Sequence, residues 1–401
     1  MSQQQADTLE AFTALDGDFY GYAEDLTERE KQALVRVRRF MEEHVRPVVN
    51  DYWDSTEFPR HLVRGIGELG ILGAPFEQTA EFENSAVFRG FATLEVARVD
   101  AGFSTFTGVS SGLCMGSIAL FGSPEQQQRW LAPLASGEAA GAFGLTEPFS
   151  GSDAARGLRT RARRDGDGWV LNGQKRWIGN ATWGDVVIIW ARDEEDGQVK
   201  GFVVPTDTPG YRATKIEGKY SQRNVQNADI EMEEMRLPLD AKLPGANGFR
   251  DTAQILKRTR IDVAWAAVGN AIGAYEAALA YTRTREQFGR PIAGFQMVQD
   301  LLVRSLGNIT ASVGMCVRAS QLLERGVQQD HHSALAKAFV TDKSREVVAW
   351  CRELFGGNGI DLSYDVIRHF NDAEALYSFE GTRQVNTLIV GRHITGESAF
   401  N

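Results

Sequence analysis

A stripe of small and apolar residues in the C-terminal half of the chain constrains the fold most. Between positions 264 and 279 these residues recur with helical spacing: Ala264, Ala267, Val268, Ala271, Ile272, Tyr275, Ala278 and Leu279. That period places them on one face of a long α-helix. Because the stripe is rich in alanine, a neighbouring helix can approach closely, which predicts a helical bundle. Further helices are expected over residues 295–323, 334–354 and 380–394.

The pattern of polar and apolar residues changes within residues 141–245. This segment contains alternating and apolar runs with Asp-Gly turns, which favour strands. Its connections are too short for helical crossovers, so we expect an antiparallel sheet. Residues 26–140 and 246–401 follow helical periodicity, and residues 1–25 are polar and acidic, as in a loose arm. The predicted fold is α+β and multidomain: an N-terminal helical domain, a middle antiparallel β domain and a C-terminal four-helix bundle.

Composition limits the possible partners and compartments. The 401 residues are 43% hydrophobic and 24% charged, as in an ordinary soluble globular protein. A net charge of −10 argues against nucleic acid or an anionic membrane as the main partner. No signal peptide and no long apolar run is evident, so we expect a cytoplasmic protein. The cysteines Cys114, Cys316 and Cys351 are far apart, which predicts reduced thiols and no metal site.

One candidate catalytic base lies near the C-terminus, in residues 377–384 (YSFEGTRQ). Glu380 follows the aromatic residues Tyr377 and Phe379, and a carboxylate in apolar surroundings has a raised pKa and can act as a base. Taken alone, the segment is better explained by an acidic residue that opens a C-terminal helix.

Four other stretches are rich in glycine, hydroxyl or aromatic side chains. They are GLTEPFSGSD at 144–153, KRWIGN at 175–180, RTREQFGRPIAGFQ at 283–296 and LFGGNG at 354–359. The first can bind phosphate or ring carbonyl oxygens, although it can also be a linker. The Trp in the second can stack on a planar ring, although a core position is commoner for this residue. No dinucleotide-binding GxGxxG motif follows an expected strand, and no P-loop is present.

In this order and spacing, the five stretches resemble those of the acyl-CoA dehydrogenase family over residues 25–400. Within the family they are most similar to glutaryl-CoA dehydrogenases and short-chain acyl-CoA oxidases. The resemblance implies a helical, β, helical fold, FAD as cofactor and an acyl-CoA substrate. It also implies a homotetramer and an electron-transfer flavoprotein as electron acceptor, with O₂ as the acceptor in the oxidase alternative.

The resemblance also implies roles for individual residues. Glu380 matches the base that removes the α-proton of the acyl thioester, and its backbone N–H matches a donor to the thioester oxygen. Gly381, Ser104 and Arg260 fall at substrate-side positions, although a structural ion pair is an equally good explanation for Arg260. The matched FAD ligands are Leu145, Thr146, Gly151, Ser152, Trp177, Ile178, Arg285, Phe288, Gln296, Gly356, Gly357, Thr382 and Gln384. Of these, Arg285, Phe288 and Gln296 match residues that reach the FAD of a neighbouring subunit.

The sequence departs from the family pattern at two informative positions. Gly179 stands where most dehydrogenases have a Thr, a form shared with the oxidase-like relatives. Ser104 stands where glutaryl-CoA dehydrogenases have an Arg that pairs with the distal carboxylate. A buried carboxylate without a cationic partner is costly, so we expect a short acyl chain without a distal carboxylate. Glutaryl-CoA dehydrogenase proper with decarboxylation, an oxidase, and a flavin-free binding protein remain alternatives.

Overall fold

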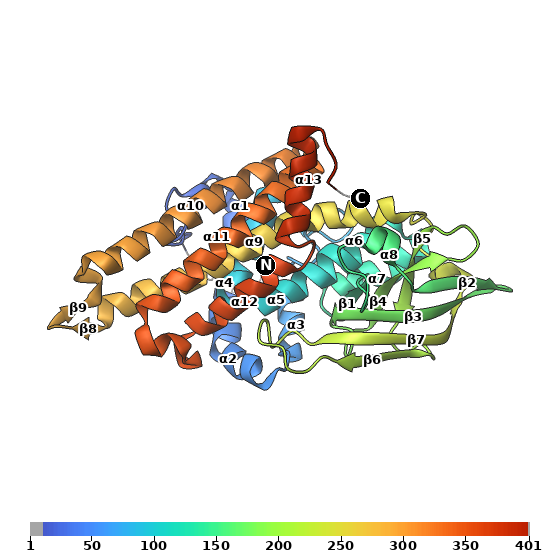
Figure 1. Cartoon of the computed structure of the whole chain (residues 1–401), viewed down its shortest axis with the longest axis horizontal. Helices are drawn as coiled ribbons and strands as arrows, with labels where there is room; N and C mark the ends of the chain where they lie inside the picture. Colours follow the sequence, from blue (N-terminus) through green and yellow to red (C-terminus); the bar gives the residue numbers. More distant parts are fainter. Residues whose placement is uncertain (1–10, 400–401) are drawn as a thin grey trace, which may run out of the picture.

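The computed structural model describes residues 11–399, and its elements follow the predicted order of helical, β and helical regions. A helical bundle forms one end of the molecule and the β-sheet forms the other (Figure 1). Helix α9 (Phe249–Thr284) runs along the molecule between these two ends. The three-part architecture predicted from periodicity is therefore confirmed.

The N-terminal region packs its helices beside α9. Its elements are η1 (Tyr22–Asp25), α1 (Glu28–Phe40), η2 (Met41–Val45), α2 (Arg46–Ser55), η3 (Arg60–Leu62), α3 (Val63–Glu68), α4 (Ala86–Val99), α5 (Ala101–Thr107), η4 (Gly108–Met115), α6 (Gly116–Phe121) and α7 (Pro124–Ala135). Residues Ala101–Phe121 form one helical rod that is long and apolar enough to cross a membrane by length and composition alone. Because 61% of that window is buried inside the fold, the rod is explained as a core helix.

The part of the expected N-terminal arm that the structure describes is packed, so the prediction of a loose arm is wrong there. The Asp18 carboxylate accepts hydrogen bonds from the backbone N–H groups of Tyr22 and Ala23, both at 2.9 Å. Ala23 is buried in the same core as α9, and Phe12 and Leu15 pack against it. These few apolar side chains anchor a segment whose overall composition is polar. The first ten residues lie outside the described part.

The middle region contains one seven-stranded sheet. Its elements are β1 (Gly141–Gly144), α8 (Ala154–Gly157), β2 (Arg161–Asp165), β3 (Gly168–Gly179), β4 (Val186–Asp193), β5 (Val199–Pro205), β6 (Tyr211–Lys215), β7 (Asn227–Pro238) and η5 (Leu239–Ala241). The sheet is mixed, because β4 pairs in parallel with both β1 and β2, so the expectation of a purely antiparallel sheet is corrected. Strand β3, antiparallel to β2, returns the chain between β2 and β4, and the segment that contains α8 returns it between β1 and β2.

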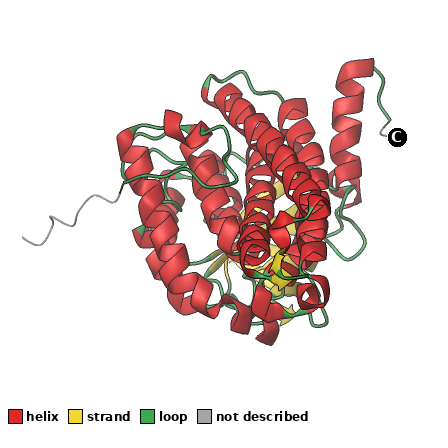
Figure 2. Cartoon of the chain, turned by 90° about the vertical axis from the view of Figure 1, so that its left-hand side faces the viewer, coloured by secondary structure: helices red, strands yellow, loops and turns green. Residues whose placement is uncertain are grey.

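The C-terminal region is a bundle of α9, α10, α11 and α12, and α13 contacts α11. Figure 2 shows the last helix, next to the C-terminus, at the side of the other helices. After α9 its elements are β8 (Glu286–Gln287), β9 (Arg290–Pro291), η6 (Ile292–Gly294), α10 (Gln296–Glu324), α11 (Asp330–Leu354), η7 (Gly356–Ile360), η8 (Leu362–Tyr364), α12 (Val366–Ser378) and α13 (Arg383–Thr395). The predicted alanine stripe of α9 is buried in the largest core, apart from Leu279 at its edge.

Helix α12 is absent from the prediction, and the last helix begins later than expected. The buried face of α12 includes Arg368, His369 and Asp372, and these polar residues obscure the apolar period. Helix α13 begins at Arg383, so Glu380 lies in a turn between two helices.

Candidate active site

Glu380 occupies a strained turn between α12 and α13. Its φ is 50°, in the left-handed region that side chains other than glycine rarely adopt, and Gly381 follows with a φ of 83°. Such strain persists where the surroundings enforce it, and it is concentrated at functional sites. The backbone N–H of Glu380 makes no hydrogen bond within residues 11–399. Because α13 begins at Arg383 and Thr382 is its N-cap, the alternative that Glu380 opens the C-terminal helix is wrong.

Helix α9 supplies a direct partner to the Glu380 carboxylate. The Thr259 hydroxyl donates a hydrogen bond of 2.7 Å to Glu380 Oε2. Burial raises the pKa of the Glu380 carboxyl, while the Thr259 hydrogen bond and the charges of Lys337 and Arg260 oppose this rise. The side chain itself remains half-buried. A carboxylate whose pKa is raised by burial, but which neighbouring groups keep available in its ionised form, has the properties of a general base.

Two neighbouring residues of α9 add charges around the base. Arg260 forms an ion pair with Asp330 at the start of α11, so the structural explanation of Arg260 holds alongside its influence on Glu380. Asp262 lies one turn after Thr259, and burial followed by the charge of Glu380 raises its pKa to about 7. Both Thr259 and Asp262 approach Gly112 of η4, where a Cβ would lie 2.9 Å from Thr259 Cγ2.

The loop after β1 and the end of β3 are tied together by a buried ion pair. Lys175 of β3 is fully buried, and its Nζ donates to Glu147 Oε1 at 2.8 Å and to the Leu145 carbonyl at 3.1 Å. Glu147 also accepts the backbone N–H groups of Arg159 and Thr160. Burial lowers the pKa of Lys175 to about 8, although Glu147 opposes the shift. The pair holds the loop against the sheet.

Trp177 is exposed, so the core alternative for this residue is wrong. It lies at a β-bulge between Lys175 and Ile178, with a φ of 65°, and half of its surface is accessible. Asn227 Nδ2 donates to the Trp177 carbonyl at 3.0 Å, which holds the bulge, while Ile178 is buried. The Thr146 carbonyl accepts the N–H of Arg176, so the 145–146 loop lies directly beside Trp177.

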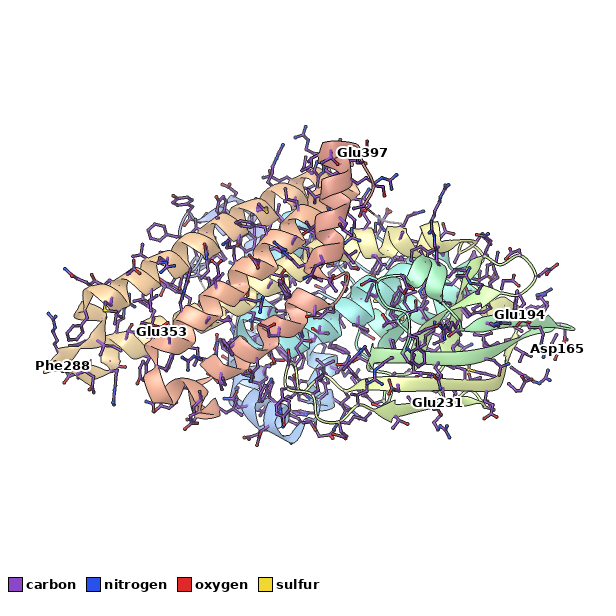
Figure 3. The ribbon with its side chains drawn as sticks, viewed as in Figure 1. Asp165, Glu194, Glu231, Phe288, Glu353 and Glu397 are labelled. Carbon is purple, nitrogen blue, oxygen red and sulfur yellow. The ribbon has the colours of Figure 1, made fainter. Side chains whose placement is uncertain are left out.

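The remaining predicted residues are distributed over several places on the subunit. Gly151 and Ser152 are exposed just before α8, and Thr382 caps α13 by accepting the N–H of Val385 at 3.2 Å, with Gln384 exposed beyond it. Phe288 projects from the β8–β9 tip at the far end of the bundle and is 93% exposed (Figure 3).

Arg285 and Gln296 flank this tip and are also exposed. Gly356 and Gly357 are exposed as well, and a Cβ at either position would meet no other atom of the described residues within 4 Å. Figure 3 shows that the β8–β9 tip and the sheet lie at opposite ends of the molecule. One chain therefore does not bring the candidate residues at the tip and those at the sheet into a single site. Ser104 of α5 is buried, and its hydroxyl has no hydrogen-bond partner in the part of the chain described.

Comparison with known proteins decides the family. Residues 27–138, 142–235 and 246–395 match the N-terminal, middle and C-terminal domains of acyl-CoA dehydrogenases. The chain belongs to the acyl-CoA dehydrogenase family. Acyl-CoA dehydrogenases are flavin-dependent oxidoreductases acting on a CH–CH group, and their cofactor is FAD.

Similar proteins span almost the whole of this acyl-CoA dehydrogenase. A probable acyl-CoA dehydrogenase of Bacillus subtilis is 34% identical over 379 residues, which cover 92% of this chain and 99% of the relative. The mitochondrial short-chain specific acyl-CoA dehydrogenase of Bos taurus is 31% identical over 377 residues, with 92% and 91% covered. The crystal structure of a glutaryl-CoA dehydrogenase from Mycobacterium smegmatis in complex with FADH2 superposes with a TM-score of 0.93 at 34% identity, covering 97% and 100%. None of these three relatives is an oxidase.

The local structure of this acyl-CoA dehydrogenase fits FAD. Trp177 offers an accessible ring next to a loop whose backbone is held by Lys175, which suits a planar ligand. The open backbone at Gly356 and Gly357 allows close approach of a ligand. Sequence reasoning missed Thr259, Lys337 and Asp262, since none of them belongs to a motif.

Proposed function

We propose that this enzyme removes the α-proton of a short-chain acyl-CoA with Glu380, using FAD as the hydride acceptor. The observation that carries the proposal is the left-handed turn at Glu380, where Thr259 holds the carboxylate and no residue of the described part, 11–399, accepts a hydrogen bond from the backbone N–H. This combination supplies a base and a hydrogen-bond donor from one residue.

The chain's own groups have separate tasks in the reaction. The Glu380 carboxylate takes the proton from the α-carbon, and burial makes it a stronger base by raising its pKa. The free N–H of Glu380 donates to the thioester oxygen as negative charge develops there. When bound, FAD accepts the hydride that leaves the β-carbon. Leu145, Thr146 and Trp177 would hold its ring, and Ser152 and Thr382 would hold other parts of the cofactor.

The proposed substrate has no carboxylate at its far end. The family resemblance assigns Ser104 to the far end of the acyl chain; this residue is 4% exposed and carries no charge, so it offers a distal carboxylate no cationic partner. Similarity to a short-chain specific dehydrogenase supports this choice, whereas similarity to a glutaryl-CoA dehydrogenase supports the alternative. We therefore keep glutaryl-CoA oxidation as the second candidate.

The assembly is proposed to be a homotetramer. Phe288, Arg285 and Gln296 are exposed at the tip of the bundle, remote from the sheet of their own chain. This arrangement favours a site completed by a neighbouring subunit. An electron-transfer flavoprotein is the proposed electron acceptor.

A visible spectrum of the purified protein and an anaerobic titration test the proposal. Butyryl-CoA is expected to bleach the flavin faster than glutaryl-CoA, and air is expected to restore the colour slowly, without rapid formation of peroxide. Faster bleaching by glutaryl-CoA selects the second candidate. Glu380→Gln is expected to keep bound FAD and lose flavin reduction, and reduction at the normal rate by this variant would refute the base assignment.

A further inference from the structure

Lys337 of α11 is a buried cation that faces the turn containing Glu380. The side chain is fully buried, and its Nζ donates to three backbone carbonyls. The accepting oxygens belong to Tyr377 at 3.1 Å, Phe379 at 2.8 Å and Gly381 at 2.6 Å. An ammonium group has three N–H donors and no acceptor, so these three bonds use all of its hydrogen-bonding capacity.

No backbone N–H of residues 11–399 donates to any of these three carbonyls. The Tyr377 carbonyl belongs to the last turn of α12, where carbonyls lack partners within the helix and a nearby cation is favourable. The carbonyls of Phe379 and Gly381 lie on either side of Glu380 in the chain. Gly381 is also held by Asn386, whose Nδ2 donates to the same carbonyl at 2.8 Å. The peptide units around the base are therefore fixed from two helices, α11 and α13.

We propose that Lys337 is a positioning residue for the catalytic base. Its ammonium group clamps the carbonyls before and after Glu380, which maintains the left-handed conformation of that residue. The clamp thereby fixes the direction of the carboxylate and of the free backbone N–H. The inference rests on the proposed role of Glu380 as the base.

The charge of Lys337 gives this role a signature that a purely structural residue lacks. No carboxylate in the described part of the chain forms an ion pair with Lys337, and the charged groups that act on it are Glu380 of the turn and Arg260 of α9. Burial lowers the pKa of Lys337 to about 7, and the charge of Glu380 opposes the shift. In return, the Lys337 charge lowers the pKa of Glu380. Removing it raises the pKa of the base.

The test compares Lys337→Met with a matched control on the same helix. Lys343→Met is the control, because Lys343 is partly exposed and pairs with Glu346 at 2.8 Å away from the turn. For each holoenzyme we would measure the rate of flavin reduction by butyryl-CoA against pH, and the hydrogen–deuterium exchange of residues 377–382. Lys337→Met is expected to reduce its flavin on the order of 10²-fold more slowly, since a small misplacement of a catalytic group has that effect.

In that variant the pH midpoint is expected to move upward and exchange is expected to accelerate at residues 377–382. Lys343→Met is expected to match the unmodified enzyme in all three measurements. A Lys337→Met enzyme with unchanged rate, midpoint and exchange overturns the clamp. If this variant does not retain FAD, exchange alone decides: acceleration confined to residues 377–382 supports the clamp, and lost protection throughout α9–α12 overturns it.

Glu380→Gln separates this inference from the proposed function. If it abolishes reduction while Lys337→Met does not slow it, only the clamp fails. If Glu380→Gln still reduces the flavin, the proposed base fails, whatever the Lys337 result.

Discussion

Replacing Thr259 by Val tests whether the hydrogen bond to Glu380 sets the strength of the base. Val keeps the branched shape and the methyl group that packs against Gly112, and it removes only the hydroxyl that donates at 2.7 Å to the carboxylate. A hydrogen bond to a charged group contributes about 1.5–3 kcal/mol. Because Glu380 is half-buried, we take the lower end, which corresponds to roughly one pH unit.

The direction in which the pKa of Glu380 changes in Thr259→Val depends on which protonation form of Glu380 the hydrogen bond favours. A donated O–H stabilises the ionised carboxylate and lowers the pKa of Glu380, so its loss raises that pKa. The pH midpoint for flavin reduction should therefore rise by roughly one unit. The rate should fall about tenfold on the acidic side of the profile, and it should be retained above the new midpoint.

The assay is anaerobic stopped-flow reduction of the bound flavin by butyryl-CoA across the pH range. Thr252→Val is the matched control, because Thr252 is a buried threonine of the same helix whose hydroxyl has no hydrogen-bond partner in the part of the chain described. The control should leave the midpoint in place. A Thr259→Val enzyme with the midpoint of the unmodified protein would refute the role assigned to this hydrogen bond.

Two further substitutions test the surroundings of the site. Asp262→Asn removes a carboxylate whose pKa is raised to about 7 by burial and by the charge of Glu380, so the pH midpoint for flavin reduction should move downward; an upward shift would contradict the coupling. Lys175→Met leaves the buried Glu147 carboxylate without its cationic partner, which should lower the free energy of unfolding by about 3–5 kcal/mol. Thermal unfolding with flavin release measures this second effect, and an unchanged melting temperature and FAD content would show that the ion pair does not hold the Leu145 loop.

Much of the architecture could be predicted because local patterns specify it. The alanine stripe of α9 is buried as its period indicates, and the change of texture at residues 141–245 marks the sheet. The mixed pairing of β4 could not be predicted, since it depends on where the β2–β3 hairpin returns the chain. Local periodicity does not determine which strands pair when they are distant in the sequence.

Helix α12 escaped prediction because distant partners compensate its buried polar residues. Arg368 donates to the Val99 carbonyl and to Asp100, and Asp372 accepts from Trp53 Nε1. Without these partners the same residues are typical of an exposed segment. The periodicity of α12 therefore becomes clear only once the tertiary contacts are known.

The base was predictable, while the groups that control it were not. Glu380 lies in a recognisable motif, whereas Thr259 is 121 residues away from it along the chain. Lys337 lies 42 residues before Phe379 and contacts only backbone carbonyls there, so no side-chain pattern marks the interaction. A motif identifies the reacting group, and the fold determines the protonation and direction of that group.

The φ of 50° at Glu380 places backbone strain at the residue that the proposed reaction uses as its base. In this conformation any side chain costs about 1–2 kcal/mol relative to glycine, so a glycine at position 380 would relieve the turn. The backbone strain at position 380 therefore favours loss of the carboxylate, whereas the hydrogen bond from Thr259 opposes that loss. The backbone conformation at position 380 favours glycine, whereas the proposed reaction requires glutamate at this position.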